Sequence, residues 1–395
     1  MSESVMHENS SGQRSLRVAC VIAGMQAGGA ERVMAQLCNH FAARGHDVTL
    51  VTLTPGSEIS FYEVSGAVHR KPLGRFTEGG GFARIVRVVA WVAALRRTLA
   101  SLQPDVVISF VDLTNVMVLL ATLGLKLPVA VSERIDPAAH ANRLSRIEKR
   151  LRRLTYPLAS RIVVQTARAA QFFDRSPSEK IVTIPNPVPR SDLTAQPGRA
   201  SVNGRFRIIG IGRLDPQKGF DILIDSFAIL AARFPDWDVV IYGQGPDRPA
   251  LLDRIARHGL DGRIRLMGIS ADVASESAQS HLIAFPSRYE GFPNALAEAM
   301  AAGLPAVAFE NVSGVEDLIA SGKSGILVHL EPTQPEKSAE LFAEALAQVM
   351  DSAELRSTMG AAAKVGVGSF QPDIVFEKWD RLIAATLYGS HKRRE

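Results

Sequence analysis

The stretch RFRIIGIGRLDPQKGFDILIDSF, residues 205–227, begins as a compact apolar strand, passes through a loop of glycine and charged residues, and ends in a helical pattern. A similar beginning occurs earlier in the chain, where the apolar run LRVACVI, residues 16–22, precedes a glycine-rich turn and a helical pattern. Strand and helix signals alternate after both points, which is typical of parallel sheets covered by helices. Two successive α/β domains are therefore expected.

The expected architecture is a pair of Rossmann-like doubly wound domains that face each other across a cleft. Between the two strand series, the chain is rich in proline, serine and glycine, which indicates a linker. A final helical pattern, residues 372–387, has no strand after it. The expected parts are a disordered N-terminus at 1–15, a first domain at 16–189, a linker at 190–204, a second domain at 205–370 and a C-terminal helix at 371–395.

Composition excludes several classes of protein. The chain of 395 residues is 46% hydrophobic and 22% charged, which is ordinary for a globular protein. No apolar run reaches the roughly 18 residues that span a bilayer, and the polar start lacks the apolar core of a signal peptide, so a cytoplasmic location is expected. Cys20 and Cys38 form no CxxC pair, and the histidines form no HxH or HExxH pattern, so neither a disulfide nor a bound metal is expected.

Motifs of other nucleotide enzymes are missing. The chain has neither the GxGxxG spacing of dinucleotide-binding folds nor the GxxxxGK[ST] of P-loop proteins, and it lacks the GxSxG of α/β-hydrolases. The net charge of +5 favours an anionic partner, either nucleotide phosphates, nucleic acid or a membrane surface. Low aromatic content, at 6%, weighs against a stacking platform for nucleic acid.

Two glycine-containing loops follow strands and suit a phosphorylated ligand. Gly29 opens the first helix in the motif AGGAER, where a backbone without a side chain lets a phosphate or sugar oxygen approach; a tight turn is the plain alternative. Arg213 and Lys218 lie just after the strand of residues 205–212, between Gly212 and Gly219. Arginine can grip two phosphate oxygens and lysine acts as a point charge, so this pair predicts a diphosphate site.

The stretch SRYEGFPNALAEAMAAGLP, residues 287–305, carries two carboxylates around a helix start. Glu290 lies in the loop after a strand, and Glu298 lies inside the helix. Carboxylates accept paired hydrogen bonds from vicinal hydroxyls, so one could hold a hexose and the other a ribose; favourable placement at a helix start is the alternative. Pro293 is expected as the first helical residue. The free amides of Phe292, Asn294 and Ala295 could bind sugar hydroxyls or phosphate, and Gly291 and Pro293 are further donor-binding candidates.

Candidates for contact with an acceptor lie in the first domain. Ser132, Glu133 and Arg134 follow a strand and are expected to face the cleft, although a helix-capping loop is an equal alternative. The basic stretch at residues 143–154 predicts either a helix whose charged face is solvated or an amphipathic helix that lies on anionic lipid.

The motifs GGAER, GRLDPQKG and YEGFPNALAEAMAAGLP together resemble the retaining glycosyltransferase family four, over residues 16 to 388 or so. The resemblance implies the two-domain fold called GT-B and a nucleotide-activated sugar as donor. In the GGAER subgroup, it implies the building of bacterial surface polysaccharides or lipid-linked oligosaccharides. Partners implied are a nucleotide-sugar donor and a glycan or polyprenyl-linked glycan acceptor, with no nucleic acid and no cofactor or metal.

The resemblance also implies roles for particular residues. Glu290 is expected at the donor sugar and Glu298 at the ribose, while Arg213 and Lys218 are expected at the diphosphate. Gly29 is expected beside the phosphate and acceptor, and the backbone near Gly268 and Ser270 beside the base. Many relatives carry a histidine where this chain has Ser132, Glu133 and Arg134, which shifts attention to Glu133.

The mechanism expected is attack by an acceptor hydroxyl on the face from which the diphosphate leaves, because no carboxylate is clearly placed as a nucleophile. The expected catalytic residues are Arg213, Lys218 and Glu290, with cations and helix amides in the place of a metal. Two alternatives remain open: a nucleotide-sugar epimerase of the same fold, and a non-catalytic protein that binds sugar or nucleic acid. Peripheral binding to the inner membrane surface is a further hypothesis.

Overall fold

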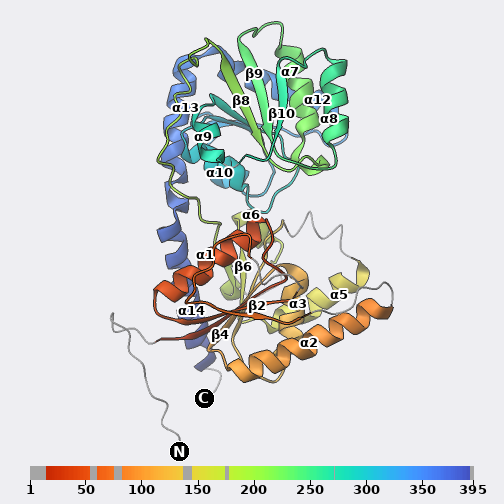
Figure 1. Cartoon of the computed structure of the whole chain (residues 1–395), viewed down its shortest axis with the longest axis vertical. Coiled ribbons are helices and arrows are strands. Elements are labelled where there is room, and N and C mark those ends of the chain that lie inside the picture. Colours follow the sequence, from red (N-terminus) through yellow and green to blue (C-terminus); the bar gives the residue numbers. More distant parts are fainter. Residues whose placement is uncertain are drawn as a thin grey trace, which may run out of the picture. The chain divides into compact units, whose positions relative to one another are not determined.

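A computed structural model describes residues 15–53, 60–74, 82–136, 145–173, 178–270 and 272–391. The chain divides into two compact units, which are described separately. The first unit comprises Met1–Pro185 together with Val375–Glu395, and the second comprises Asn186–Ile374 (Figure 1). Residues 1–14 of the expected disordered N-terminus lie outside the described residues.

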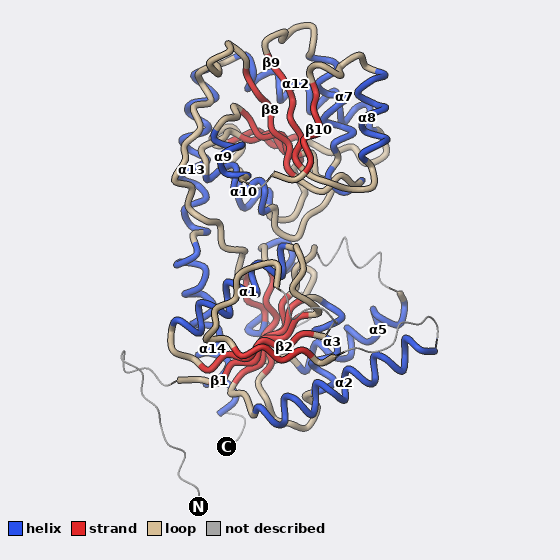
Figure 2. The backbone as a smooth tube through the Cα atoms, in the orientation of Figure 1, coloured by secondary structure: helices blue, strands red, loops and turns tan. Residues whose placement is uncertain are grey.

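The first unit contains a seven-stranded parallel sheet in the order β3-β2-β1-β4-β5-β6-β7. Its central strands are almost entirely buried, because helices cover both faces of the sheet (Figure 2). The strands are β1 (Arg17–Ile22), β2 (Asp47–Thr52), β3 (His69–Pro72), β4 (Val106–Phe110), β5 (Val129–Ser132), β6 (Arg161–Val164) and β7 (Ile181–Thr183).

Two apolar cores lie on opposite faces of this sheet. One joins β1 and β4 to α1 and to α14, whose Trp379 and Ile383 are buried against it, and Figure 1 shows these two helices side by side. The other joins the sheet to α2 and α3. The helices of the unit are α1 (Gly29–Ala43), α2 (Phe82–Leu102), α3 (Asp112–Ala121), α5 (Arg146–Thr155), α6 (Ala167–Gln171) and the final α14 (Pro372–His391).

The second unit contains a six-stranded parallel sheet in the order β10-β9-β8-β11-β12-β13. The strands are β8 (Phe206–Ile211), β9 (Trp237–Tyr242), β10 (Ile264–Gly268), β11 (Leu282–Phe285), β12 (Ala306–Phe309) and β13 (Gly325–Val328). The helices are α7 (Phe220–Leu230), α8 (Arg248–Arg257), α9 (Val273–Ala278), α10 (Asn294–Ala301), α11 (Val315–Leu318), α12 (Pro335–Asp351) and α13 (Ala353–Gly366). The fold class expected from the sequence, two Rossmann-like parallel-sheet domains, is confirmed.

The strand order fixes where a ligand site belongs. In the second unit, β8 leads to β9 on one side, while β11 pairs on its other side, so the winding direction reverses between β8 and β11. Ligands of open parallel sheets bind beyond the carboxyl ends of the strands at such a reversal. A ligand site is therefore expected in the loops after β8 and β11.

The segment expected as a linker, residues 190–204, lies within the second unit, and the division falls at Pro185 instead. The reason is burial: Val188 and Ala195 belong to the core of the second unit. The N–H groups of these two residues donate to the carbonyls of Phe370 and Ala302 at 2.7 and 2.8 Å.

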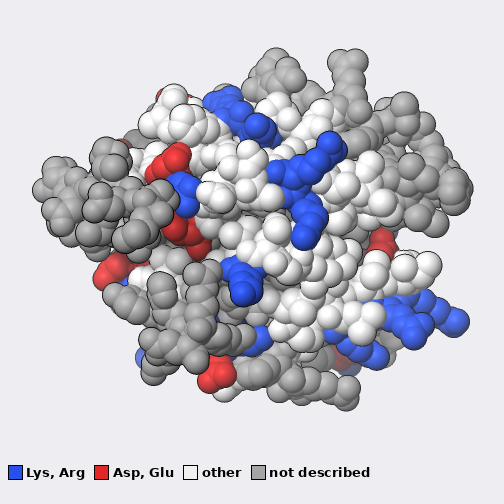
Figure 3. Space-filling view, turned by 90° about the horizontal axis from the view of Figure 1, so that it is seen from below, with Lys and Arg blue, Asp and Glu red and all other residues white. Residues whose placement is uncertain are grey.

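Within the described residues, no helix is both long enough and apolar enough to cross a membrane. On the face of the molecule seen in Figure 3, Lys and Arg side chains lie in several separate groups among uncharged residues. The net charge of +5 is therefore not gathered into one patch on that face.

Candidate functional site

Lys218 and Glu290 meet at the carboxyl ends of β8 and β11. The Lys218 ammonium lies 2.6 Å from Oε1 of Glu290, and both side chains are largely buried, at 17% and 7% exposure. The ammonium also lies 5.6 Å from the centroid of the Phe285 ring, at the end of β11. A shielded cation and carboxylate thus sit together at the point where the sheet reverses, as the sequence predicts for a site of this fold.

The loop that carries Lys218 must pass very close to the loop that carries Glu290. Gly219 follows Lys218 with φ at +67°, in the left-handed region, and a Cβ atom there would lie 2.0 Å from the carbonyl oxygen of Pro286. Any other residue at position 219 would therefore force the two loops apart.

Arg213 is placed differently from Lys218. Its side chain is 68% exposed, and its Nε donates to Oδ2 of Asp215 at 2.7 Å. The structure therefore keeps Arg213 at the surface in an ion pair with its own loop, and a bound anion would have to compete with Asp215 for it.

The start of α10 differs from expectation at two residues. The helix begins at Asn294, so Pro293 is the residue before it rather than the first helical residue. The N–H of Asn294 donates to the carbonyl of Phe292 at 3.0 Å, so it is not free to bind a ligand. The side-chain oxygen of Asn294 accepts from Asn186 at 2.9 Å. The N–H groups of Phe292 and Ala295 have no acceptor among the described residues, because they precede the repeating bonds of the helix.

The remaining donor candidates are Gly291, Glu298, Gly268 and Ser270. Gly291 is half-buried directly after Glu290, and Glu298 is half-buried within α10. Gly268 ends β10 with φ at +79°, and its carbonyl accepts from the N–H of Gly243 at 2.7 Å. Ser270 accepts a bond from the N–H of Asp272 at 3.1 Å, which shapes the turn into α9.

Sequence reasoning missed a glycine loop after β9, residues 243–245. Gly243 has φ at +150°, and a Cβ atom there would lie 1.8 Å from the carbonyl oxygen of Gly212. A Cβ atom on Gly245 would lie 2.1 Å from the carbonyl of Leu214. This loop packs against the backbone that leads to Lys218. The signal was present, since two glycines directly follow a strand in the sequence YGQG.

In the first unit, Gly29 is exposed as the first residue of α1, beyond the carboxyl end of β1. The preceding Gly28 is extended, and its carbonyl accepts from the N–H of Arg32 at 3.1 Å. Gly29 therefore occupies a helix N-terminus, the position that the sequence predicts for it.

Ser132, Glu133 and Arg134 are buried, whereas the sequence predicts that they face a cleft. Glu133 forms an ion pair with Arg152 at 3.0 Å, and it accepts a hydrogen bond from the Tyr156 hydroxyl. Burial, together with the negative charge of Glu133, raises the pKa of Tyr156 well above its ordinary value. Glu133 is therefore held in an internal network with Arg152 and Tyr156.

Arg134 is held by aromatic rings. Its guanidinium carbon lies 3.7 Å from the centroid of Phe110 and 5.6 Å from that of Trp379. Burial lowers the pKa of Arg134 to about 9. The Ser132 carbonyl, at the end of β5, accepts from the side chain of Asn115 at 3.1 Å, so all three residues fasten the sheet to its covering elements.

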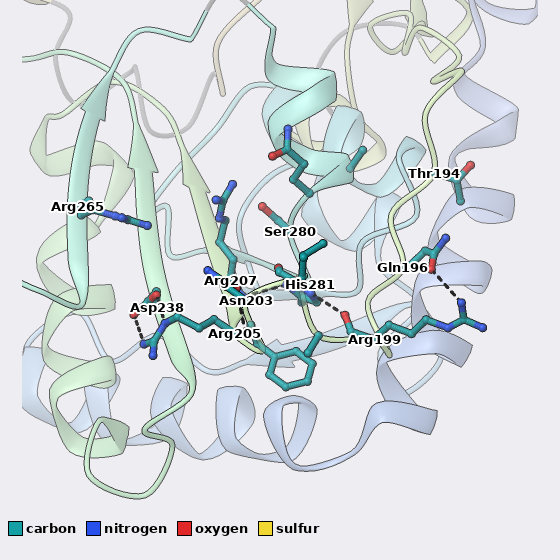
Figure 4. Close-up of a pocket in the computed structure, with 16 residues that line it drawn as sticks. Thr194, Gln196, Arg199, Asn203, Arg205, Arg207, Asp238, Arg265, Ser280 and His281 are labelled. Atoms are coloured by element: carbon teal, nitrogen blue, oxygen red, sulfur yellow. Dashed lines mark hydrogen bonds and ion pairs between the residues drawn. The ribbon is translucent and has the colours of Figure 1, made fainter.

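A cavity of about 810 Å³ opens at the other edge of the second unit's sheet, near the amino ends of its strands (Figure 4). Arg205 forms two bonds with Asp238, at 2.6 and 2.5 Å, and Arg207 pairs with Glu276 at 3.3 Å. His281 accepts from the N–H of Arg207 at 2.9 Å and lies 2.8 Å from the carbonyl oxygen of Arg199. These polar groups hold one another, and the cavity lies away from the reversal point.

Comparison with known proteins gives two adjoining family matches. Residues 27–192 match a model described as Glycosyltransferase Family 4, and residues 195–365 match one described as Glycosyl transferases group 1. The two matches together cover nearly all of the chain between α1 and α13.

Curated relatives match along most of this chain. An exopolysaccharide phosphotransferase of Streptomyces coelicolor is 30% identical over 91% of this chain, which spans only 39% of that protein's length. An alpha-1,4-N-acetyl-D-galactosaminyltransferase of Campylobacter jejuni, named for a glycan-PP-undecaprenol substrate, is 25% identical over 93% of this chain and 98% of its own. An amylovoran biosynthesis glycosyltransferase of Erwinia amylovora is 26% identical over 90% and 96%.

Solved structures share the fold. A sucrose-phosphate synthase from Thermosynechococcus elongatus superposes with a TM-score of 0.80, at 17% identity, over 95% of this chain and 100% of that one. HepE from Anabaena, solved with UDP and glucose, superposes with a TM-score of 0.73, at 18% identity, over 94% and 100%. At these identities, the likeness shows the arrangement of both sheets and their helices.

Proposed function

We propose that this chain, a glycosyltransferase with a family 4 domain at residues 27–192 and a group 1 domain at residues 195–365, is a hexosyltransferase. In this proposal, it transfers a hexose-type sugar from a nucleotide-diphosphate donor to a glycan hydroxyl. The observation that carries this proposal is the shielded ion pair of Lys218 and Glu290 at the ends of β8 and β11. One member suits a phosphate and the other suits sugar hydroxyls.

The donor binds in the second unit. Lys218 meets the diphosphate, and the exposed Arg213 adds a second cation once it exchanges Asp215 for phosphate oxygens. Glu290 accepts hydrogen bonds from the hexose, and Glu298 accepts them from the ribose. The backbone around Gly268 and Ser270 receives the base. Because Lys218 already contacts Glu290 in the free protein, the donor finds both groups ordered side by side.

The reaction retains the configuration of the sugar. The acceptor hydroxyl attacks on the face from which the diphosphate departs and passes its proton to the departing phosphate oxygen. The charge that develops on the leaving group is stabilised by Lys218, Arg213 and the N–H groups of Phe292 and Ala295. Lys218 and the two backbone N–H groups are ordered before the donor binds, so they need little reorganisation as charge develops, and Arg213 joins them after it leaves Asp215. No metal is required for this step in the proposal.

The acceptor is a glycan, or a glycan carried on a polyprenyl lipid, bound by the first unit. Support comes from the relatives in Campylobacter and Erwinia, which are named for a lipid-linked glycan and for amylovoran. Gly29 is the exposed candidate on this side, whereas Ser132, Glu133 and Arg134 are buried and Glu133 is paired with Arg152. Base assistance by Glu133 is accordingly left out of the proposed mechanism.

The enzyme works on the inner membrane surface, and α5 contacts the lipid. Ile147 and Leu154, seven residues apart on α5, form an apolar stripe and are 72% and 64% exposed, and Leu158, in the short 3-10 turn that follows the helix, is 51% exposed. Basic side chains flank the stripe, as expected for a helix lying on anionic lipid. The exposed basic residues are Arg146, Lys149, Arg150 and Arg153. Arg152, expected from the sequence to share this role, is excluded because it is buried.

The test is a thermal-shift screen with nucleotide sugars of different bases and sugars, followed by transfer assays with the compounds that stabilise the protein. NMR of the product reports the anomeric configuration. Stabilisation of the wild type that is lost in Lys218→Ala supports the proposal. Formation of an epimer from the donor alone would replace it with the epimerase alternative, and stabilisation by random oligonucleotides alone would replace it with a nucleic-acid binder.

A further inference from the structure

Asp221 and Arg288 form a two-pronged ion pair beside the candidate donor site. Arg288 lies in the loop after β11, two residues before Glu290, and Asp221 lies in the first turn of α7, three residues after Lys218. The two guanidinium NH₂ groups donate to the two carboxylate oxygens at 3.0 and 2.8 Å. This fork geometry fixes direction as well as distance.

Further bonds join the same two loops. Arg288 also donates from its side chain to the Pro216 carbonyl at 2.6 Å, and from its backbone to the Gln217 carbonyl at 2.8 Å. The Gln217 side chain donates back to the Tyr289 carbonyl at 2.9 Å. These bonds involve residues on both sides of Lys218 in one loop, and the two residues directly before Glu290 in the other.

The carboxylate is held in its charged form. Burial by itself would raise the pKa of Asp221, but the hydrogen bonds and the charge of Arg288 outweigh burial, and the pKa is lowered from its ordinary value. The close approach at Gly219, where a Cβ atom would lie 2.0 Å from the Pro286 carbonyl, leaves the loops little room to shift unless these bonds break.

We infer that Asp221 and Arg288 are positioning residues that hold Lys218 against Glu290 in the geometry required by the donor. This inference rests on the proposed function for its effect on transfer, and on the geometry alone for its effect on the loops. Neither residue touches the donor in this scheme; both act through Lys218 and Glu290. Loss of the pair lets the two loops separate, so the diphosphate and the hexose are no longer held by one rigid frame.

A matched control is available on the same helix. Asp225 lies one turn after Asp221 on α7, and it pairs with Arg254 and His258 of the segment around α8 instead of with a functional loop. Asp221→Asn and Asp225→Asn therefore remove the same charge from the same helix, and only the first should loosen the functional loops.

The first experiment is amide hydrogen exchange on the unliganded full chain. Asp221→Asn is expected to speed exchange at the Arg288 amide about tenfold, because that amide donates to Gln217 across the loops. Asp225→Asn should leave this amide unchanged. Equal exchange at Arg288 in the two variants would overturn the inference, whatever reaction the protein catalyses.

The second experiment is a double-mutant cycle on sugar transfer. Asp221→Asn is expected to lower kcat about tenfold in the wild type and by a clearly smaller factor in a Lys218→Ala background, since part of its effect passes through Lys218. Arg288→Lys should lower kcat nearly as much as Asp221→Asn does, because lysine cannot form the two parallel bonds to the Asp221 carboxylate. An unchanged tenfold loss in the Lys218→Ala background would contradict the inference. Absence of transfer by the wild type with every nucleotide sugar would instead contradict the proposed function.

Discussion

Nη2 of Arg152 lies 3.0 Å from Oε1 of Glu133, and these side chains are 8% and 5% exposed. Arg152 belongs to α5, and Glu133 directly follows β5, so the ion pair fastens a surface helix to the end of a central strand. The guanidinium of Arg152 also lies 5.2 and 5.3 Å from the centroids of the Phe172 and Phe173 rings. The basic helix therefore has a structural side and an exposed side.

Arg152→Ala should destabilise the first unit strongly. The substitution leaves the charge of Glu133 buried without its cation, and breaking such a pair costs about 3–5 kcal/mol. Arg153→Ala, at the exposed neighbour on the same helix, should cost less than about 0.5 kcal/mol. Urea unfolding measures both values. Similar midpoints for the two variants would show that Arg152 does not stabilise the unit.

The fold was readable from the sequence because strand burial leaves a strong pattern. The segments of β1, β4 and β8 are short apolar runs bounded by loops, and the sheets place all three in central positions. The boundary near residue 190 was misplaced because proline and serine content indicates an irregular backbone without indicating which core the segment packs against.

The site was only partly readable. The closeness of Lys218 and Glu290 could be predicted, since each follows an apolar strand and neighbouring parallel strands end at one edge. The burial of Glu133 could not be predicted, because its partner Arg152 lies on the inward side of α5, where the buried residues are polar, and its partner Tyr156 directly follows that helix. Helical periodicity indicates an apolar face, and a buried arginine on that helix looks the same in sequence as an exposed one.

Lys218→Ala should lower transfer strongly. Loss of the cation that stabilises the leaving diphosphate is expected to cost on the order of 2–4 kcal/mol of activation free energy, or about 10²–10³-fold in kcat. Steady-state kinetics with the donor found in the ligand screen measure this, with Lys323→Ala on an exposed loop as the control. Turnover within about threefold of the wild type would remove Lys218 from the mechanism.

Transfer should continue in the presence of a chelator. In the proposed mechanism, Lys218, Arg213 and helix amides stabilise the leaving group, which is the role that a metal ion plays in other phosphoryl-containing sites. Rates measured in EDTA, and again after addition of Mg²⁺ or Mn²⁺, should agree within about twofold. A loss of transfer in EDTA that a divalent ion restores would contradict the metal-independent mechanism.

The second unit should lose stability as the pH falls from neutrality towards 4. Burial, together with the charges of Arg356 and Arg207, lowers the pKa of His281 from 6.5 to about 4. Between pH 6.5 and about 4, the unfolded chain therefore binds more protons than the folded chain. His281 lowers the free energy of unfolding progressively as the pH falls through this range, and it has no such effect above pH 6.5. Urea unfolding at several pH values measures the decline, and His281→Asn should flatten it. The same slope in both proteins would contradict the assignment.

Binding to anionic vesicles should depend on the exposed side of α5. Reversal of charge at Arg150 and Arg153 removes attraction to lipid without touching the buried Arg152, so the variant should fold normally and lose most of its partition into vesicles that contain phosphatidylglycerol. A variant with charge reversal at Arg248 and Arg257, which are exposed on α8, has the same change in net charge and should bind as the wild type does.

Replacement of Ile147 and Leu154 by serine should also weaken binding, because the apolar stripe supplies the part of the affinity that salt does not screen. Sedimentation with vesicles at low and high salt measures all four proteins. Equal losses from the α5 and α8 reversals would mean that overall charge, and not this helix, directs the protein to lipid.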